Sequence, residues 1–264
     1  MKRKYTSKER KSLLLEMLRN SNKILITDLV RTFEVSEVSI RKDLADLEEK
    51  KLLLRVKGGA VNMHQLNDMD DLSIDRKQLK NAREKQIIGK YAASLIKENE
   101  TIILDSGTTT LEIAKNLAKY NNLTIITNGL NIAMALAGYN RFSVIVLGGN
   151  MRSVSVSTVG MLAESCLRNF YCDKLFLGVD SFNMERGFST PNIEEASLNQ
   201  AMISAAKEVI AVFDSSKFEK RSFAFIASLD KINTIITDSG ISEEIREHIE
   251  RQGVKLYIVD IDNP

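Results

Sequence analysis

The chain has 264 residues, of which 44% are hydrophobic and 27% charged, and its formal net charge at pH 7 is +2. This length and hydrophobic content suffice for one large core and a smaller one, and they exclude fibrous and low-complexity classes. The 2 Cys and 2 His form no motif typical of a disulfide framework or a structural metal. No apolar run approaches 18 residues, and the basic start leads into a charged helix rather than the apolar core of a signal peptide. We therefore expect a cytoplasmic protein without membrane contact, metal or cofactor.

The first predicted elements are two short helices separated by a tight turn. An apolar pattern marks the earlier helix, at Ile24, Leu29, Val30 and Phe33. A second apolar stripe recurs at i, i+4 and i+7, at Ile40, Leu44 and Leu47. The opposite face of this later helix carries side chains that can hydrogen-bond bases or phosphates, namely Ser36, Glu37, Ser39, Arg41 and Lys42. The pattern predicts a helix-turn-helix whose second helix contacts DNA, and the alternative is an amphipathic helix with a solvated charged face.

A basic hairpin is predicted after these helices. The run 52–59 indicates a strand that ends in a Gly-Gly turn, and we expect the flanking Arg55 and Lys57 to contact the DNA backbone as the wing of a winged helix. Residues 1–60 hold 15 Lys and Arg against 9 Asp and Glu, whereas the rest of the chain holds 22 against 26. A basic head of this kind supplies the non-specific, salt-dependent part of DNA affinity. Double-stranded operator DNA is therefore the expected partner of this region.

The next 20 residues, 61–80, break the periodicity and mix polar with scattered apolar side chains. This composition is typical of a linker with short ordered pieces. We therefore predict a winged helix-turn-helix domain at 1–60, a linker at 61–80 and a second domain at 81–264.

In the second domain, apolar β-rich runs alternate with helical patterns. The expected strands are Thr101–Leu104, Leu123–Ile126, Phe142–Leu147, Lys174–Val179, Glu208–Phe213, Thr234–Ile236 and Val254–Val259. Near-continuous apolar strands interleaved with helices predict an α/β fold, with a mostly parallel, doubly wound sheet covered on both faces.

Polar or flexible residues follow these strands, and in open parallel sheets ligands bind outside the carboxyl ends of the strands. The turn 105–110 combines a glycine, several hydroxyls and the amino end of a helix, which predicts a phosphate cradle. A second turn, 147–152, places two glycines before Arg152, and a third, 214–218, places Lys217 just beyond a strand. Together the three turns predict a site for a phosphorylated polyol. The alternative at any single position is an Asp or Asn that begins a turn or caps a helix.

These segments carry a family resemblance. VS-x-x-S-I-R-K-D-L-x-x-L followed by L-x-R-V-K-G-G-A resembles the N-terminal signature of the DeoR family of bacterial transcriptional regulators. ILDSGTTT, ITNGLN, LGGNMR, LFLGVDS, ERGFSTPNIEEASLNQAM and DSSKF resemble the motifs of its sensor domain. Within the family, the combination is most similar to regulators of N-acetylgalactosamine and galactosamine use.

The resemblance implies a sensor domain similar in fold to ribose-5-phosphate isomerase, and a homo-oligomeric repressor, dimer or tetramer, that a sugar phosphate or amino-sugar phosphate releases from its operator. The phosphate would bind the cradle formed by Ser106, Gly107, Thr108, Thr109 and Thr110. The sugar would be surrounded by Asp105, Asn128, Gly149, Arg152, Asp180, Glu195 and Lys217.

The rival hypothesis is a sugar-phosphate isomerase or deaminase with a basic head. Asp105, Asp180 and Glu195 offer carboxylates for proton transfer. Both histidines, however, lie outside the strand-end motifs, and no catalytic dyad follows from the spacing. We expect no catalytic residues and no enzymatic activity.

Overall fold

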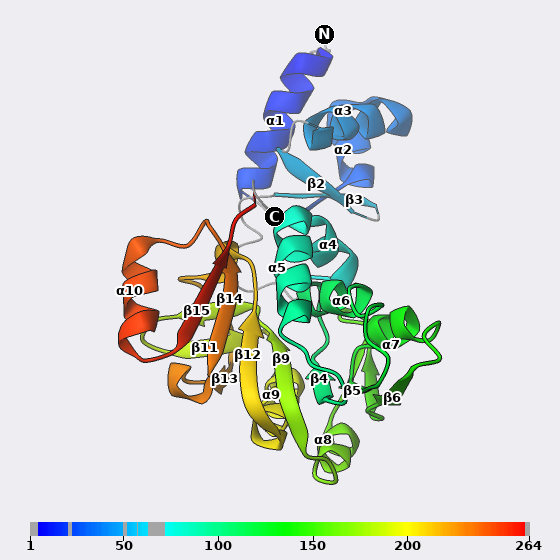
Figure 1. Ribbon diagram of the computed structural model, residues 1–264. Coiled ribbons are helices and arrows are strands. Elements are labelled where there is room, and N and C mark those ends of the chain that lie inside the picture. The colour runs from blue at the N-terminus through cyan, green and yellow to red at the C-terminus, as the bar shows by residue number, and fades with distance from the viewer. Residues whose placement is uncertain (1–4, 21–22, 50–51, 57, 63–71, 262–264) are drawn as a thin grey trace. The chain divides into compact units, whose positions relative to one another are not determined.

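The computed structural model describes residues 5–20, 23–49, 52–56, 58–62 and 72–261. The chain divides into two compact units, Met1–Asp70 and Asp71–Pro264 (Figure 1). Among the described residues, no helix combines the length and hydropathy needed to cross a membrane.

The first unit packs three helices against a small antiparallel sheet of order β1-β3-β2. Its elements are α1 (Ser7–Asn20), β1 (Lys23–Leu25), α2 (Ile26–Phe33), α3 (Glu37–Glu49), β2 (Leu53–Val56) and β3 (Gly59–Asn62). The predicted stripe Ile40, Leu44 and Leu47 is buried in the core of this unit, with exposed fractions of 0%, 0% and 3%. Glu34, in the left-handed region at φ 52°, ends α2 and turns the chain toward α3. The predicted helix-turn-helix is confirmed.

Strands β2 and β3 form the predicted wing hairpin. Val56 pairs with Gly59, and Gly58 adopts φ +83° between the two strands. A Cβ on Gly59 would lie 2.0 Å from the carbonyl oxygen of Ile24, so only glycine lets β3 approach β1 this closely. Lys57, a predicted DNA contact, lies outside the described residues.

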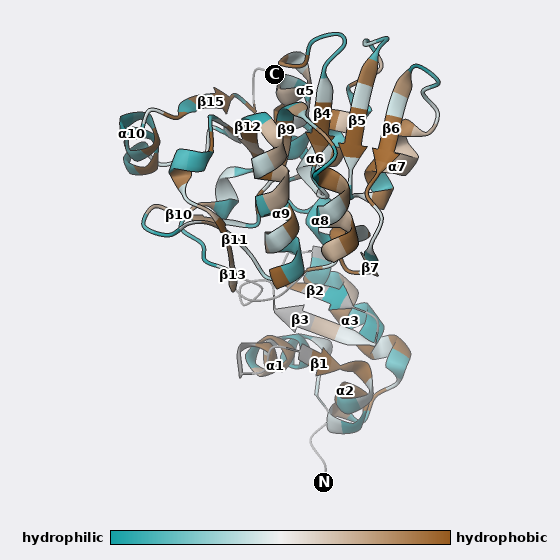
Figure 2. Ribbon diagram, turned by 90° about the horizontal axis from the view of Figure 1, so that it is seen from below, coloured by the Kyte–Doolittle hydropathy of each residue, from teal (hydrophilic) through white to brown (hydrophobic). Residues whose placement is uncertain are grey.

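A seven-stranded parallel sheet of order β15-β14-β12-β9-β4-β5-β6 forms the centre of the second unit. Its strands are β4 (Thr101–Leu104), β5 (Leu123–Thr127), β6 (Phe142–Val146), β9 (Cys172–Gly178), β12 (Ala206–Val212), β14 (Thr234–Asp238) and β15 (Lys255–Val259). Each matches one of the seven predicted strands to within a few residues, and the predicted α/β fold is confirmed. In Figure 2 the strands β5 and β6 are largely hydrophobic, whereas the loops at one end of them are hydrophilic.

Helices cover both faces of this sheet because consecutive strand residues point to opposite sides. In β4, Ile102 and Leu104 pack in one core cluster and Ile103 packs in the other. The first cluster contains residues of α5 (Ala82–Ser94), α6 (Thr108–Lys115) and α7 (Leu130–Leu136). The second contains residues of α8 (Met161–Leu167), α9 (Ile193–Ala205) and α10 (Glu243–Arg251).

The order of the strands reverses between β4 and β9. From β4 the chain proceeds outward through β5 and β6, and from β9 it proceeds in the other direction through β12, β14 and β15. Loops leaving two adjacent parallel strands on opposite sides create a crevice at their carboxyl ends. The polar turns that follow β4 and β9 therefore face each other across this crevice.

Five short strands of the second unit were not predicted. In the first unit β1 was not predicted, and Ile24, which was assigned to the earlier helix, lies in this strand. Strands β10 (Ser181–Asn183), β11 (Gly187–Thr190) and β13 (Ala224–Ala227) form an antiparallel sheet, and β7 (Asn150–Arg152) pairs with β8 (Ser157–Val159). Each has only three or four residues, too few to show an alternating pattern. The small sheet is buttressed by a cluster of rings, in which Phe182 contacts Phe188 and Phe218 at centroid distances of 4.7 and 5.7 Å.

The structure also differs from the predicted linker over 61–80 at both of its ends. Strand β3 continues to Asn62, so the wing extends beyond residue 60. Helix α4 (Ile74–Leu79) belongs to the second unit, where the amide of Ile74 donates to the carbonyl oxygen of Val154 at 2.8 Å. Helix α4 could not be predicted from the local sequence pattern, because the contacts that hold it are mainly polar and involve residues distant in sequence.

Candidate functional site

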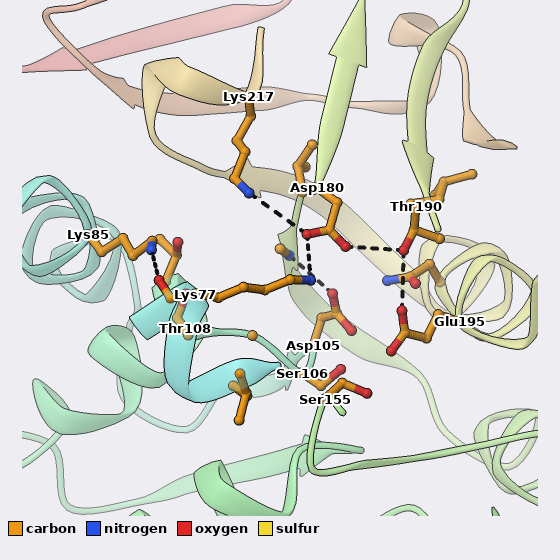
Figure 3. Close-up of a pocket in the computed structure, with 17 residues that line it drawn as sticks. Lys77, Lys85, Asp105, Ser106, Thr108, Ser155, Asp180, Thr190, Glu195 and Lys217 are labelled. Carbon is orange, nitrogen blue, oxygen red and sulfur yellow. Dashed lines mark hydrogen bonds and ion pairs between the residues drawn. The ribbon is translucent and has the colours of Figure 1, made fainter. Parts of the chain in front are cut away.

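A pocket lies at the carboxyl ends of β4 and β9, where the strand order reverses. Eight of the predicted effector-binding residues line it: Asp105, Ser106, Gly107, Thr108, Thr109, Asp180, Glu195 and Lys217 (Figure 3). They come from the turn after β4, the end of β9, the start of α9 and the 3₁₀ turn Ser215–Lys217. Side chains from distant parts of the sequence thus converge at one edge of the sheet.

The turn after β4 presents backbone amides and hydroxyls to this pocket. The Ser106 amide donates to Oδ1 of Asn128 at 2.9 Å, which fixes the start of the turn. The first amide to bond back along α6 is that of Leu111, which donates to Gly107 at 3.2 Å. The amides just before Leu111 therefore have no acceptor within the helix and carry its positive end, where an anion is stabilised. Gly107 is extended at φ 167°, so its role is spatial: a Cβ there would lie 3.2 Å from Oγ1 of Thr110.

Asp180 is the centre of an ion-pair network in the pocket. Its Oδ1 accepts from Nζ of Lys77 at 2.7 Å and lies 3.9 Å from Nζ of Lys217, and its Oδ2 accepts from Oγ1 of Thr190 at 3.2 Å. Burial alone would raise the pKa of Asp180, but the charges of Lys77 and Lys217 lower it to about 2. Asp180 is therefore a carboxylate at neutral pH and attracts hydrogen-bond donors.

Asp105 lies in the opposite electrostatic environment. Its Oδ2 accepts from the amide of Gly178 at 3.2 Å. Burial and the nearby charge of Glu195 raise the pKa of Asp105 to about 8. Two carboxyl groups of the same pocket thus carry different charges at neutral pH, one ionised and one largely protonated.

Glu195 joins this network to the β7–β8 hairpin. Its Oε2 lies 3.2 Å from Oγ1 of Thr190, whose single hydrogen is shared between this oxygen and Oδ2 of Asp180. Its Oε1 accepts from Nε of Arg152 at 3.0 Å. The cap of α9 is Asn192, whose Oδ1 accepts from the amide of Glu195 at 2.9 Å. The Glu195 carboxylate is therefore available to the pocket rather than used to cap its own helix.

On the first unit, the predicted DNA contacts lie in and just before α3 and on β2. Ser36, Glu37, Arg41, Lys42 and Arg55 are exposed and Ser39 is partly exposed. Arg41 Nη2 pairs with Oε1 of Glu37 at 2.6 Å, and Arg55 Nε pairs with Oε2 of Glu48 at 2.6 Å. Exposed pairs of this kind contribute only about 0.2–1 kcal/mol, so DNA phosphates or bases can replace the carboxylates at little cost.

Comparison with known families identifies both units. Residues 10–66 match the DeoR-like helix-turn-helix domain, and residues 80–239 match the DeoR C-terminal sensor domain. The chain belongs to the DeoR family. It is therefore a helix-turn-helix transcriptional regulator, and the isomerase or deaminase alternative is not supported.

Full-length relatives carry regulator names. A DeoR-family protein of Escherichia coli O157:H7 named "Putative aga operon transcriptional repressor" is 38% identical over 98% of this chain and 96% of its own length. The transcriptional repressor AccR of Agrobacterium fabrum is 37% identical over 94% and 97%. Among solved structures, ribose 5-phosphate isomerase A of Methanocaldococcus jannaschii shows a weak likeness, with 16% identity and a TM-score of 0.39 over 53% of this chain and 55% of that one.

Four predicted effector residues lie outside the pocket of this DeoR-family sensor: Thr110, Asn128, Gly149 and Arg152. Thr110 is fully buried, and Asn128 holds the turn after β4 in place: its Oδ1 accepts from the amide of Ser106, and its Nδ2 donates to the carbonyl oxygen of Thr158. A Cβ on Gly149, at φ +137°, would lie 2.4 Å from the carbonyl oxygen of Val159, so this glycine permits the close approach of β8. Nε of Arg152 donates to Oε1 of Glu195 at 3.0 Å and to Oγ of Ser155 at 3.4 Å, and both of these residues line the pocket. Proximity in sequence to a strand end therefore did not distinguish residues that line the pocket from residues that hold the lining residues in place.

Sequence reasoning also missed residues that line the pocket, notably Lys77, Lys85, Ser155, Thr190 and Asn199. Lys77 lies within the segment taken as linker, and Lys85 lies on the first turn of α5. Lys85 is buried and donates to the carbonyl oxygens of Lys77 and Lys80, and burial lowers its pKa to about 8. Thr190 and Asn199 lay within a quoted family motif, which was the only signal for them in the sequence.

Proposed function

We propose that this DeoR-family regulator represses a sugar or amino-sugar catabolic operon in the cytoplasm. It would act as a homo-oligomer whose first units bind operator DNA, and a phosphorylated sugar in the pocket of the second unit would release it. The observation that carries this proposal is the composition of the pocket, which brings together the amide end of α6, three lysines and three carboxyl groups. The name of the aga operon relative supports an amino sugar as the sugar component.

The anionic part of the ligand would bind at the turn after β4. Amides at the start of α6 and the hydroxyls of Ser106, Thr108 and Thr109 offer donors to phosphate oxygens. The ammonium groups of Lys85 and Lys217 line the same pocket and add positive charge. Asp180 is the shared counter-charge of Lys77 and Lys217, so one carboxylate faces two ammonium groups, and we expect the phosphate to be required for tight binding.

The polar part of the ligand would bind at the carboxyl groups. Asp180 and Glu195 are acceptors suited to hydroxyls or an ammonium group. An amino-sugar phosphate such as galactosamine 6-phosphate places an anion and a cation on one small molecule, which matches both regions of the pocket.

The first unit of each protomer would contact DNA through α3 and through the wing, the hairpin of β2 and β3. The start of a recognition helix is the part that enters the major groove. The residues at and just before the start of α3 are Ser36, Glu37, Ser39, Arg41 and Lys42. Arg55 and Lys57 of the wing would add contacts to the sugar-phosphate backbone.

The test uses an operator fragment selected by the protein from random DNA, with binding followed by fluorescence anisotropy. We expect galactosamine 6-phosphate to weaken operator binding 5–150-fold, a normal range for coupling, and galactosamine to have little effect. Thr108→Val should reduce the effect of galactosamine 6-phosphate on operator binding. Thr124→Val, on β5 and outside the pocket, should leave that effect unchanged. An equal response to phosphorylated and unphosphorylated sugars would overturn the phosphate site.

A further inference from the structure

Helix α4 is the first element of the second unit, and it forms part of the effector pocket. Ile74 and Lys77 line the pocket together with the turn after β4 and the end of β9 (Figure 3). The first unit ends at Asp70, and α4 begins four residues later, at Ile74. The covalent connection between the DNA-binding unit and the sheet therefore runs through a wall of the ligand site.

Polar contacts hold α4 in place. The Ile74 amide bonds to the carbonyl oxygen of Val154 at 2.8 Å, and Nζ of Lys77 bonds to Oδ1 of Asp180 at 2.7 Å. At its other end, Lys85 donates to the carbonyl oxygens of Lys77 and Lys80. Ile74 is the buried apolar residue of this helix, whereas Leu79 is 80% exposed. A six-residue helix held in this way has little apolar burial to oppose its displacement.

The contact between Lys77 and Asp180 occupies the acceptor that a ligand would need. Oδ2 of Asp180 is engaged by Thr190, and Oδ1 is engaged by the Lys77 ammonium, with Lys217 at 3.9 Å. An ammonium of an amino sugar that donates to Oδ1 would bring a like charge beside Nζ of Lys77. The two cations therefore compete for this acceptor.

We propose that Lys77 is a built-in competitor of the effector at Asp180, and that its displacement frees α4 and thereby loosens the DNA-binding units. This inference rests on the proposed function, since it takes the effector to bind this pocket and the protein to bind DNA with more than one head. Freeing α4 lengthens the tether that leads to each head. A longer tether lowers the effective concentration of the second head at its half-site, so the operator is held less tightly.

The first test compares Lys77→Gln with Lys80→Gln in the full chain, because Lys80 is exposed on the same segment. Without ligand, Lys77→Gln should bind the selected operator at least 5-fold more weakly than the parent, and Lys80→Gln should bind like the parent. Calorimetry with galactosamine 6-phosphate should show tighter binding to Lys77→Gln, since the competitor is gone. Lys77→Arg, which keeps the cation, should restore operator binding, and this rescue separates the ion pair from a general loss of folding.

The opposite pattern would overturn the inference: weaker sugar-phosphate binding by Lys77→Gln with unchanged operator affinity would make Lys77 a simple ligand for the phosphate. A parent protein that ignores all sugar phosphates would instead overturn the proposed effector, while weakened ligand-free DNA binding by Lys77→Gln would still support the role of α4.

Hydrogen exchange of the parent supplies a second measurement. Galactosamine 6-phosphate should speed amide exchange in 74–80 and slow it in 106–111. Slower exchange in both segments would mean that the ligand closes α4 over the pocket, contrary to displacement.

Discussion

The two units of this DeoR-family regulator use their charged side chains differently. In the first unit, Arg41 and Arg55 pair with carboxylates four and seven residues away, and the two arginine side chains are 59% and 47% exposed. In the second unit, Lys77 pairs with Asp180 across 103 residues of sequence, and the two side chains are only 20% and 21% exposed. Exposed local pairs can be exchanged for DNA phosphates at little cost, whereas a partly buried pair is exchanged only for a ligand of matching chemistry. The first arrangement suits binding of a polyanion, and the second suits selection of one small molecule.

The largest expected effect comes from separating the two units. A shortened chain that begins at residue 71 should fold, because both large core clusters consist of residues from the second unit. It should bind galactosamine 6-phosphate and lose operator binding entirely, as calorimetry and anisotropy would measure. If the shortened chain is insoluble, or if it fails to bind the ligand that the full chain binds, the second unit depends on the first for its fold or its binding site.

Next in size is the effect of Asp180→Asn. The substitution leaves Lys77 and Lys217 without their shared counter-charge and removes an ionised acceptor for the ligand. A hydrogen bond to a charged group contributes about 1.5–3 kcal/mol, so ligand affinity should fall roughly 10–150-fold in calorimetry. Asp230→Asn, at an exposed site, is the matched control. Equal affinities would mean that the ligand does not use the Asp180 network.

A comparable change is expected in the head from Arg41→Ala. If Arg41 contacts a base, its loss should cost roughly 1–3 kcal/mol of DNA-binding free energy and relax specificity at one base pair. Lys42→Ala should weaken binding to all DNA sequences alike, and it should reduce the slope of log affinity against log salt concentration by about 1. Operator and random DNA compared over a salt series distinguish the two roles. Unchanged operator affinity in Arg41→Ala would remove this residue from the interface.

The last prediction concerns the stability of the fold rather than binding, and it depends on pH. Because the pKa of Asp105 rises from 3.8 to about 8 on folding, the folded state retains a proton that the unfolded chain loses. Stability from this group is greatest below pH 4 and declines toward pH 8, by at most about 1.4 kcal/mol per unit. Asp180 has the opposite sign, since its pKa of about 2 gives stability that is lost as pH falls from about 4 to 2.

Asp105→Asn tests this difference because the amide oxygen can still accept from Gly178. Thermal unfolding from pH 5 to 9 should show a smaller decline for Asp105→Asn than for the parent, so the variant should be relatively more stable at pH 8. Parallel curves would contradict the protonated state of Asp105.

The same contrast explains what could be predicted from sequence. The stripe on α3 and the seven parallel strands were found because their signals repeat within one element. Asp105, Asp180 and Lys217 were found because strand ends share one edge of the sheet. Lys77 and Lys85 were not predicted to line the pocket because they come from helices rather than from strand ends. Gly149 lies outside the pocket, and the sequence could not show this because its packing against Val159 is a tertiary contact.

The most direct test of a sensor coupled to a DNA-binding head is reciprocity, since coupling between two sites must be equal in both directions. Calorimetry would measure the affinity of the full chain for galactosamine 6-phosphate, first alone and then saturated with operator DNA. We predict that the operator weakens ligand binding by the same factor, between 5 and 150, by which the ligand weakens operator binding. An identical ligand affinity with and without the operator would contradict the coupling of the two units.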